Sequence, residues 1–217
     1  MIYVVSGYRR SGTSVMMAAL KASGLPVLSN ARLDDFTARH PVIDGYKPTK
    51  DLFYEVGRKF YMSPVEMRNF IRRDETAIKI FYDGLPILPA GNYTVIFMQR
   101  DPKEIVESLK HVDKYKESFN NHNKLKKMAV HPQKVAPINY PFDVYAEYKP
   151  EDVQHCLDIA KARKDIDVIE VQFSDLVENP AKTLNFIRQT PLGRIRVPID
   201  VDKAVAVIDP DWYRCVA

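Results

Sequence analysis

The first twenty residues constrain the fold of this chain more than any other part of it. An apolar run over 2–5 is followed by the segment SGYRRSGTS at 6–14 and by a helix-forming run over 15–22. Glycines in a turn between a strand and a helix let the backbone approach a phosphate closely, and amide N–H groups at the helix start attract an anion. The sequence therefore predicts a phosphate-binding loop, with the amides of residues 11–14 directed at the anion.

The loop lacks the lysine that nucleotide triphosphatases use. In the pattern G-x-x-x-x-G-K-[ST] that lysine bridges the β- and γ-phosphates, and this chain keeps both glycines but has Thr13 at the lysine position. Arg10 supplies a positive charge nearby. We therefore expect a phosphate that is anchored rather than transferred.

A second motif follows a buried strand expected over 93–99. It delivers Arg100, Asp101 and Pro102 to the start of a helix, and Ser108 lies eight residues after Arg100. One interpretation makes Arg100 and Ser108 a phosphate-binding pair. The alternative is an arginine in a surface ion pair and a serine that faces solvent.

These two motifs resemble those of sulfotransferases, which use 3′-phosphoadenosine 5′-phosphosulfate (PAPS). The loop is similar to G-x-P-[RK]-S-G-T-[ST], which holds the 5′-phosphate, with Arg9 in place of proline; residues 100–108 match R-[DN]-P-x-[DE]-x-x-x-S, which holds the 3′-phosphate. A segment at 208–214 is similar to the terminal I-D-P-x-x-x-R of bacterial members. The resemblance thus implies a set of cofactor-binding residues: Arg9, Arg10, Ser11, Gly12, Thr13, Ser14, Arg100, Ser108 and Arg214.

The resemblance also implies catalytic candidates. Lys79 lies in an expected strand over 77–81, at the place where many members have the lysine of K-D-P, which contacts the leaving oxygen. Ile80 and Phe81 replace the Asp-Pro of that pattern. The alternative is a lysine that extends to water. Glu55 is similar to the glutamate base of bacterial and tyrosylprotein-type members, and its alternative is a surface ion pair at helical spacing. His111 is the second choice of base.

A third segment, 168–180, resembles the strand and the following Y-[ED]-[DE]-L-x-x-x-P motif of the family, with Phe173 in place of tyrosine. Leu176, Leu184 and Ile187 have a spacing suited to packing on a sheet. We assign this segment a structural role and no chemistry.

Strands are expected over 2–6, 77–81, 93–99 and 167–173, and helices over 13–23, 50–60, 63–73, 102–112, 150–164 and 180–189. This alternation predicts an α/β fold of three layers, a mostly parallel sheet flanked by helices, similar to P-loop NTPases. Residues 1–217 are expected to form a single domain. A lysine-rich excursion over about 112–149 reads as a solvated loop, or else as a lid or a contact for an anionic acceptor.

Composition sets further bounds. The chain has a net charge of +4, two cysteines and no run of eighteen apolar residues, so we expect neither a disulfide framework nor a membrane span. Met1 leads directly into the first strand, which favours a cytoplasmic protein of bacterial or viral type. The modest positive charge suits a doubly phosphorylated nucleotide and does not require nucleic acid.

The sequence thus predicts a PAPS-dependent sulfotransferase that needs no metal and acts on a hydroxyl or amine of a small-molecule, saccharide or peptide acceptor. Two alternatives stay open. One is a P-loop kinase or nucleotide hydrolase, which would need Mg²⁺ and a loop lysine. The other is a nucleotide-binding protein of the same fold without turnover. Acceptor identity and oligomeric state are not specified by the sequence.

Overall fold

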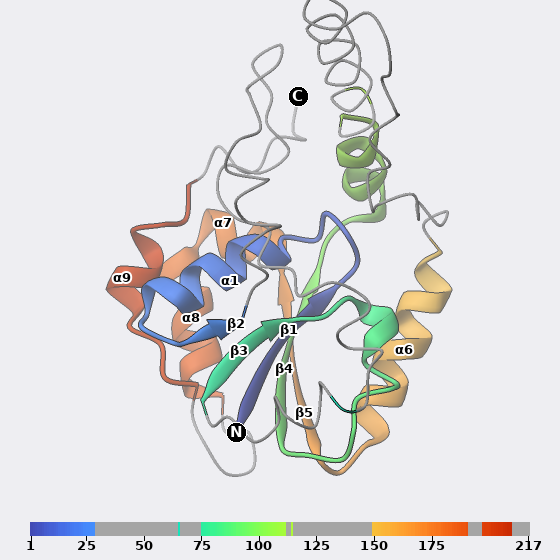
Figure 1. Ribbon diagram of the computed structural model, residues 1–217. Coiled ribbons are helices and arrows are strands. Elements are labelled where there is room, and N and C mark those ends of the chain that lie inside the picture. Colours follow the sequence, from blue (N-terminus) through green and yellow to red (C-terminus); the bar gives the residue numbers. More distant parts are fainter. Residues whose placement is uncertain (29–64, 66–74, 112–113, 115–148, 191–196, 210–217) are drawn as a thin grey trace, which may run out of the picture.

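A five-stranded, all-parallel sheet forms the centre of the molecule in a computed structural model that describes residues 1–28, 65, 75–111, 114, 149–190 and 197–209 (Figure 1). Its strands lie in the order β2-β3-β1-β4-β5. Their bounds are Ile2–Gly7 for β1, Val27–Leu28 for β2, Thr76–Lys79 for β3, Tyr93–Gln99 for β4 and Ile166–Gln172 for β5.

Helices cover both faces of this sheet. On one face lie α1 (Thr13–Ala22), α7 (Phe173–Glu178), α8 (Pro180–Gln189) and α9 (Val201–Val205). On the other lie α6 (Pro150–Ala162) and the short 3₁₀ helix η1 (Tyr82–Gly84), and a further helix over 102–111 extends above the sheet. The α/β fold of three layers, a parallel sheet flanked by helices, is as the sequence predicts, and a short loop joins β1 to α1.

The two faces follow from the alternation of side chains along the strands. In β1, Tyr3 and Val5 pack with α1, α7, α8 and α9, whereas Ile2 and Val4 pack with α6. Successive residues of a strand point to opposite faces, so a strand covered on both sides reads as one continuous apolar run. Leu184 and Ile187 of α8 are fully buried, which confirms the packing role predicted for them.

Several element boundaries differ from the sequence prediction. β3 ends at Lys79, two residues before the predicted end, because the chain after Ile80 turns into η1. Phe173, predicted to end a strand, begins α7 instead. The short elements β2, η1, α7 and α9 are not predicted, since each lacks the length that makes periodicity visible. The predicted helices 50–60 and 63–73, and the excursion over 112–149, lie outside the described residues apart from single positions.

The lower edge of the sheet, where the strands begin, is closed by an arginine clamp. Arg163 donates Nε and Nη2 to the two carboxylate oxygens of Asp165, at 3.0 and 2.7 Å, and its Nη2 also donates to the Pro89 carbonyl at 3.0 Å. These bonds lower the pKa of Asp165 to about 2, while burial raises the pKa of Tyr93 to about 12. The clamp ties the end of α6 to the segment that enters β4.

Within the described parts of the chain, no helix is both long and apolar enough to cross a membrane.

Candidate functional site

The loop between β1 and α1 is held in a tight curl. Its backbone has positive φ angles at Gly7 (143°), Arg10 (75°) and Gly12 (92°). Ser11 closes the curl, since its N–H and its Oγ both donate to the carbonyl of Tyr8, at 3.1 and 2.7 Å. A Cβ on Gly7 would lie 2.5 Å from the Met98 carbonyl oxygen, so only glycine fits there. This curl delivers the chain to the first turn of α1, where amide N–H groups lack helical partners.

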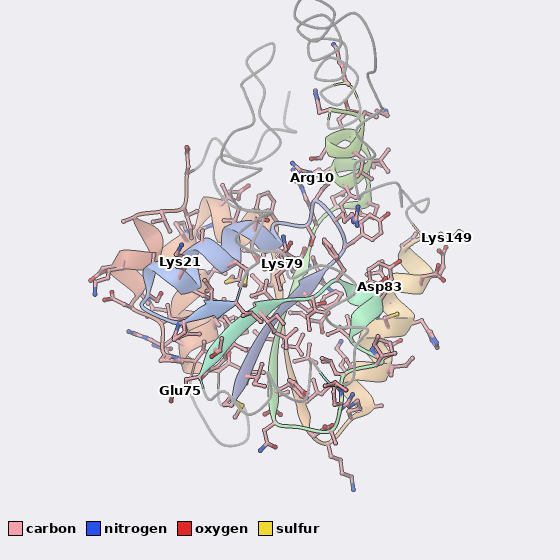
Figure 2. All side chains as sticks on the ribbon, in the orientation of Figure 1. Arg10, Lys21, Glu75, Lys79, Asp83 and Lys149 are labelled. Atoms are coloured by element: carbon pink, nitrogen blue, oxygen red, sulfur yellow. The ribbon has the colours of Figure 1, made fainter. Side chains whose placement is uncertain are left out.

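The two motifs that the sequence predicts to bind phosphate meet in space. Arg10 of the loop donates Nε to Ser108 Oγ at 2.9 Å, and Arg100 donates Nη1 to the carbonyl oxygen of Arg10, also at 2.9 Å. Ser108 is 4% exposed, and Figure 2 shows Arg10 beside the helix 102–111 that carries it. Residues separated by 90 or more positions therefore form one cluster at the upper edge of the sheet, where the strands end.

Arg100 lies at the centre of this cluster. Its side chain is only 5% exposed, its Nε bonds Glu104 Oε2 at 2.9 Å, and its guanidinium carbon lies 4.6 Å from the ring centroid of Phe173. Arg100 does form the ion pair of the alternative interpretation, but its side chain is buried rather than at the surface, and Ser108 does not face solvent. Asp101 caps the helix, because its Oδ1 accepts from the Lys103 N–H at 2.7 Å.

Phe173 belongs to the site, although the sequence gives it no chemical role. A Cβ on Gly12 would lie 2.2 Å from its ring, so the ring packs directly against the loop backbone. Phe173 thus fills the space between the loop and the Arg100 guanidinium, and a planar cation stacks well on an aromatic face. In the sequence, the one indication of a role in the site is the position of Phe173 at the end of a predicted strand, since ligands bind at the carboxyl ends of parallel strands.

Lys79 reaches the same edge from β3. It is 4% exposed, and its Nζ donates to Ser14 Oγ in the first turn of α1 at 3.2 Å. The alternative in which this lysine extends to water is therefore wrong. Figure 2 shows Lys79 beneath α1. Lys79 brings a positive charge to the start of α1, next to Thr13, which replaces the lysine of the NTPase pattern. Thr13 itself is 5% exposed.

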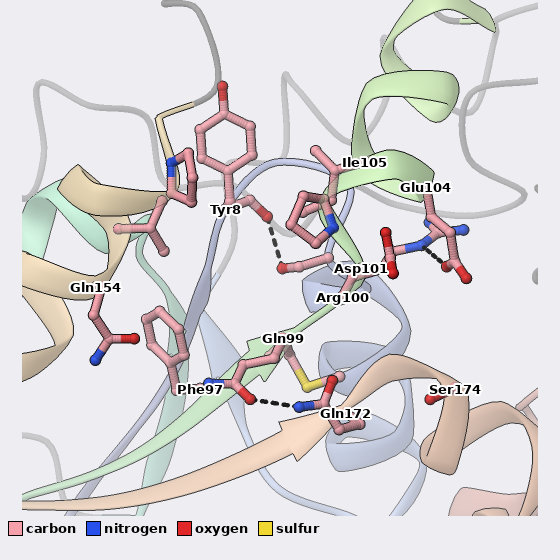
Figure 3. A pocket seen from close by; sticks show the side chains of 15 residues that line it. Tyr8, Phe97, Gln99, Arg100, Asp101, Glu104, Ile105, Gln154, Gln172 and Ser174 are labelled. Atoms are coloured by element: carbon pink, nitrogen blue, oxygen red, sulfur yellow. Dashed lines mark hydrogen bonds and ion pairs between the residues drawn. The ribbon is translucent and has the colours of Figure 1, made fainter.

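A cavity of about 520 Å³ adjoins Arg100 at the upper edge (Figure 3). Its walls come from the ends of β4 and β5, the start of α6 and the beginning of the helix 102–111. A volume of this size is typical of small-molecule sites. Gln172 Nε2 donates to Gln99 Oε1 at 2.6 Å on its floor. The lining side chains that offer hydrogen bonds include Tyr8, Ser11, Gln99, Arg100, Glu104, Gln154, Gln172 and Ser174. Gln154 and Gln172 carry no motif that sequence reasoning recognises.

The remaining predicted site residues fall elsewhere. His111 has a side chain 49% exposed, with Nε2 at 3.7 Å from Glu107 Oε1, and it does not line the cavity. Glu55 and Arg214 lie outside the described residues. Arg9 lies over the ring of Phe81, with its guanidinium carbon 5.0 Å from the centroid.

Comparison with known proteins adds little to this geometry. No protein-family model matches the chain, and no curated protein matches it. Among solved structures, one similar chain is an unliganded sugar kinase from a Janibacter species, with 13% sequence identity, a TM-score of 0.38, and coverage of 96% of this chain and 98% of that one.

Proposed function

We propose that this protein binds PAPS and transfers its sulfuryl group to a hydroxyl or amine acceptor. The observation that carries the proposal is the bond between Arg10 and Ser108, together with the bond from Arg100 to the Arg10 carbonyl. Two motifs that resemble the 5′- and 3′-phosphate motifs of sulfotransferases form one partly buried cluster. Such a cluster offers donors to two separate phosphate groups, as a nucleotide phosphorylated at both the 3′ and the 5′ position carries.

The residues present fit the nucleotide chemically. The loop offers helix-start amides for one phosphate, and Arg100 and Ser108 offer charged and neutral donors for another. The adjoining cavity contains amide and hydroxyl groups that suit a nucleoside. When bound, PAPS supplies the activated sulfuryl group, and the protein supplies position and charge.

Two side chains take the chemical roles in this proposal. Lys79 neutralises negative charge that grows on the leaving phosphate oxygen as the sulfur–oxygen bond breaks. Glu55 accepts the proton of the acceptor as its oxygen or nitrogen bonds to sulfur, with His111 as the second choice of base. A Glu55→Gln variant should bind nucleotide normally and lose transfer.

The test is thermal unfolding with adenosine 3′,5′-bisphosphate, with adenosine 5′-monophosphate and with ATP plus Mg²⁺. At about a hundredfold its dissociation constant, a ligand stabilises the folded state by about 2.7 kcal/mol. We expect the bisphosphate to raise the melting temperature most and the monophosphate much less. In Ser108→Ala the advantage of the bisphosphate should shrink.

Arg100→Ala should abolish the stabilisation by bisphosphate, with Arg163→Ala as a matched control that removes an arginine from the opposite edge. A shift seen with ATP and Mg²⁺ alone would favour the kinase or hydrolase alternative. Binding of the bisphosphate with no transfer to any acceptor would favour a nucleotide-binding protein without turnover.

A further inference from the structure

Two cationic side chains converge on one aromatic ring beside the phosphate loop. The guanidinium carbon of Arg9 lies 5.0 Å from the ring centroid of Phe81, and Nζ of Lys79 lies 5.7 Å from the same centroid. Both distances are within the range in which a ring quadrupole attracts a cation. Arg9 comes from the loop and Lys79 from β3, so the ring holds together charges from two separate segments.

The arrangement concentrates positive charge at one side of the loop. Lys79 is 4% exposed and also donates to Ser14 Oγ, so its ammonium group is fixed between α1 and the ring. Two like charges on one ring repel each other, and an anion placed near them relieves that repulsion.

Arg9 and Phe81 both stand where the sulfotransferase patterns have proline. Arg9 replaces the proline of G-x-P-[RK]-S-G-T-[ST], and Phe81 replaces the proline of K-D-P. A proline would fix φ at each position. The structure has the two replacements in contact instead. The contact between them therefore restrains the loop against the segment after β3, in the place of two rigid residues.

We propose that Phe81 is a positioning residue that orients Arg9 toward the anionic sulfuryl group of the nucleotide and Lys79 toward the oxygen from which that group departs, whereas Arg10, Arg100 and Ser108 serve the two phosphates. This inference rests on the proposed function. It assigns Arg9 to the transferred group rather than to the 5′-phosphate. Phe81 acts through the two cations and touches neither the acceptor nor the reacting atoms.

A neighbouring pair of rings provides a matched control. The ring centroids of Tyr8, in the loop, and Tyr82, in η1, are 5.6 Å apart. Tyr8 directly precedes Arg9, and Tyr82 directly follows Phe81. The pair links the same two segments. Tyr82→Leu therefore loosens the loop as Phe81→Leu does, but leaves the cations on their ring.

The experiment compares the affinities of PAPS and adenosine 3′,5′-bisphosphate, measured by calorimetry without acceptor. The two ligands differ by the sulfuryl group. In Phe81→Leu we expect the affinity for PAPS to fall about tenfold relative to that for the bisphosphate. Phe81→Tyr keeps the ring and should restore the parent ratio, and Tyr82→Leu should keep that ratio.

Arg9→Gln provides a second route if Phe81→Leu does not fold. It should lower the same ratio of affinities. In the double variant Arg9→Gln with Phe81→Leu, the fold-loss of relative PAPS affinity should be no larger than the product of the two single losses, and it should be smaller if the two side chains act as a unit. The inference would be overturned if the ratio of the two affinities stayed unchanged in both single variants, or if Tyr82→Leu lowered that ratio as much as Phe81→Leu. Binding of the bisphosphate by the parent protein would still support the nucleotide site in that case. Failure of the parent to bind either nucleotide would instead overturn the proposed function, and this inference with it.

Discussion

The two edges of the sheet each carry an arginine paired with a carboxylate, and the two pairs differ in what they hold. At the lower edge Arg163 is bidentate on Asp165 and donates to backbone carbonyls, so its donors close a turn. At the upper edge Arg100 bonds Glu104 and the Arg10 carbonyl, stacks on Phe173 and lines a cavity. The same residue type thus stabilises the chain at one edge and organises a candidate binding site at the other.

The difference follows from where the strands begin and end. In parallel α/β sheets the loops after the strands gather at the carboxyl edge, and ligands bind there. The upper edge accordingly has the left-handed residues Gly7, Arg10 and Gly12 in one short loop. Glycine adopts such conformations readily, whereas at Arg10 the positive φ carries a cost that the surrounding contacts offset.

The largest expected effect on the free energy of unfolding comes from replacing a glycine. Two glycines with nearly equal φ angles lie at opposite edges of the sheet and can be compared. Gly12 has φ 92° and would place a Cβ 2.2 Å from the Phe173 ring, whereas Gly24 has φ 91° and no atom within 4 Å. Gly12→Ala should lower the free energy of unfolding by about 3 kcal/mol, from backbone strain and steric overlap, and Gly24→Ala by about 1 kcal/mol. Urea unfolding of both variants measures the difference. Equal losses would mean that Phe173 does not pack on the loop.

The next effect separates the two arginines. Arg163→Ala should lower the free energy of unfolding by about 2 kcal/mol, because it removes two bonds to the Asp165 carboxylate, which keeps the Gly91 N–H, and the bonds to the Leu88 and Pro89 carbonyls. Its affinity for adenosine 3′,5′-bisphosphate should equal that of the parent protein. Arg100→Ala should weaken the affinity about thirtyfold or more. Denaturant unfolding and calorimetry on each variant test this separation, and a loss of affinity in Arg163→Ala would contradict it.

The smallest effect is the pH dependence of the lower edge. Bonding to Arg163 lowers the pKa of Asp165 from 3.8 to about 2, so the folded state holds this proton less strongly than the unfolded state. The resulting stability is complete above pH 4 and is lost as the pH falls through 2. For this partly exposed carboxylate we expect a contribution of about 1 kcal/mol. Asp165→Asn should show a smaller loss of stability between pH 4 and 2 than the parent; parallel profiles would exclude the contribution.

Sequence reasoning works well for the parts of the site that local patterns encode. The loop at 6–14 and the unit from Arg100 to Ser108 each combine a strand, a turn and a helix start, and all three have local signatures. The structure brings these two units together. Glu55 and Arg214 stay predictions, since they lie outside the described residues.

Sequence reasoning fails where a residue's role depends on a distant neighbour. Phe173 was given packing alone, and its contacts with Gly12 and Arg100 join segments far apart in the chain. Lys79 was equally consistent with a lysine that extends to water, because nothing local reveals that α1 lies above it. Gln154 and Gln172 enter the cavity only because α6 and β5 meet there.

The sequence by itself determined the α/β class, the parallel strands and the strand–loop–helix form of residues 2–22, because alternation, glycine spacing and helix-start residues act over a few positions. The tertiary structure alone decided that β1 lies between β3 and β4. That strand order places Lys79 on one side of the loop and Arg100 on the other. The pairing of strands depends on contacts between residues many positions apart, and no short segment of the chain contains that information.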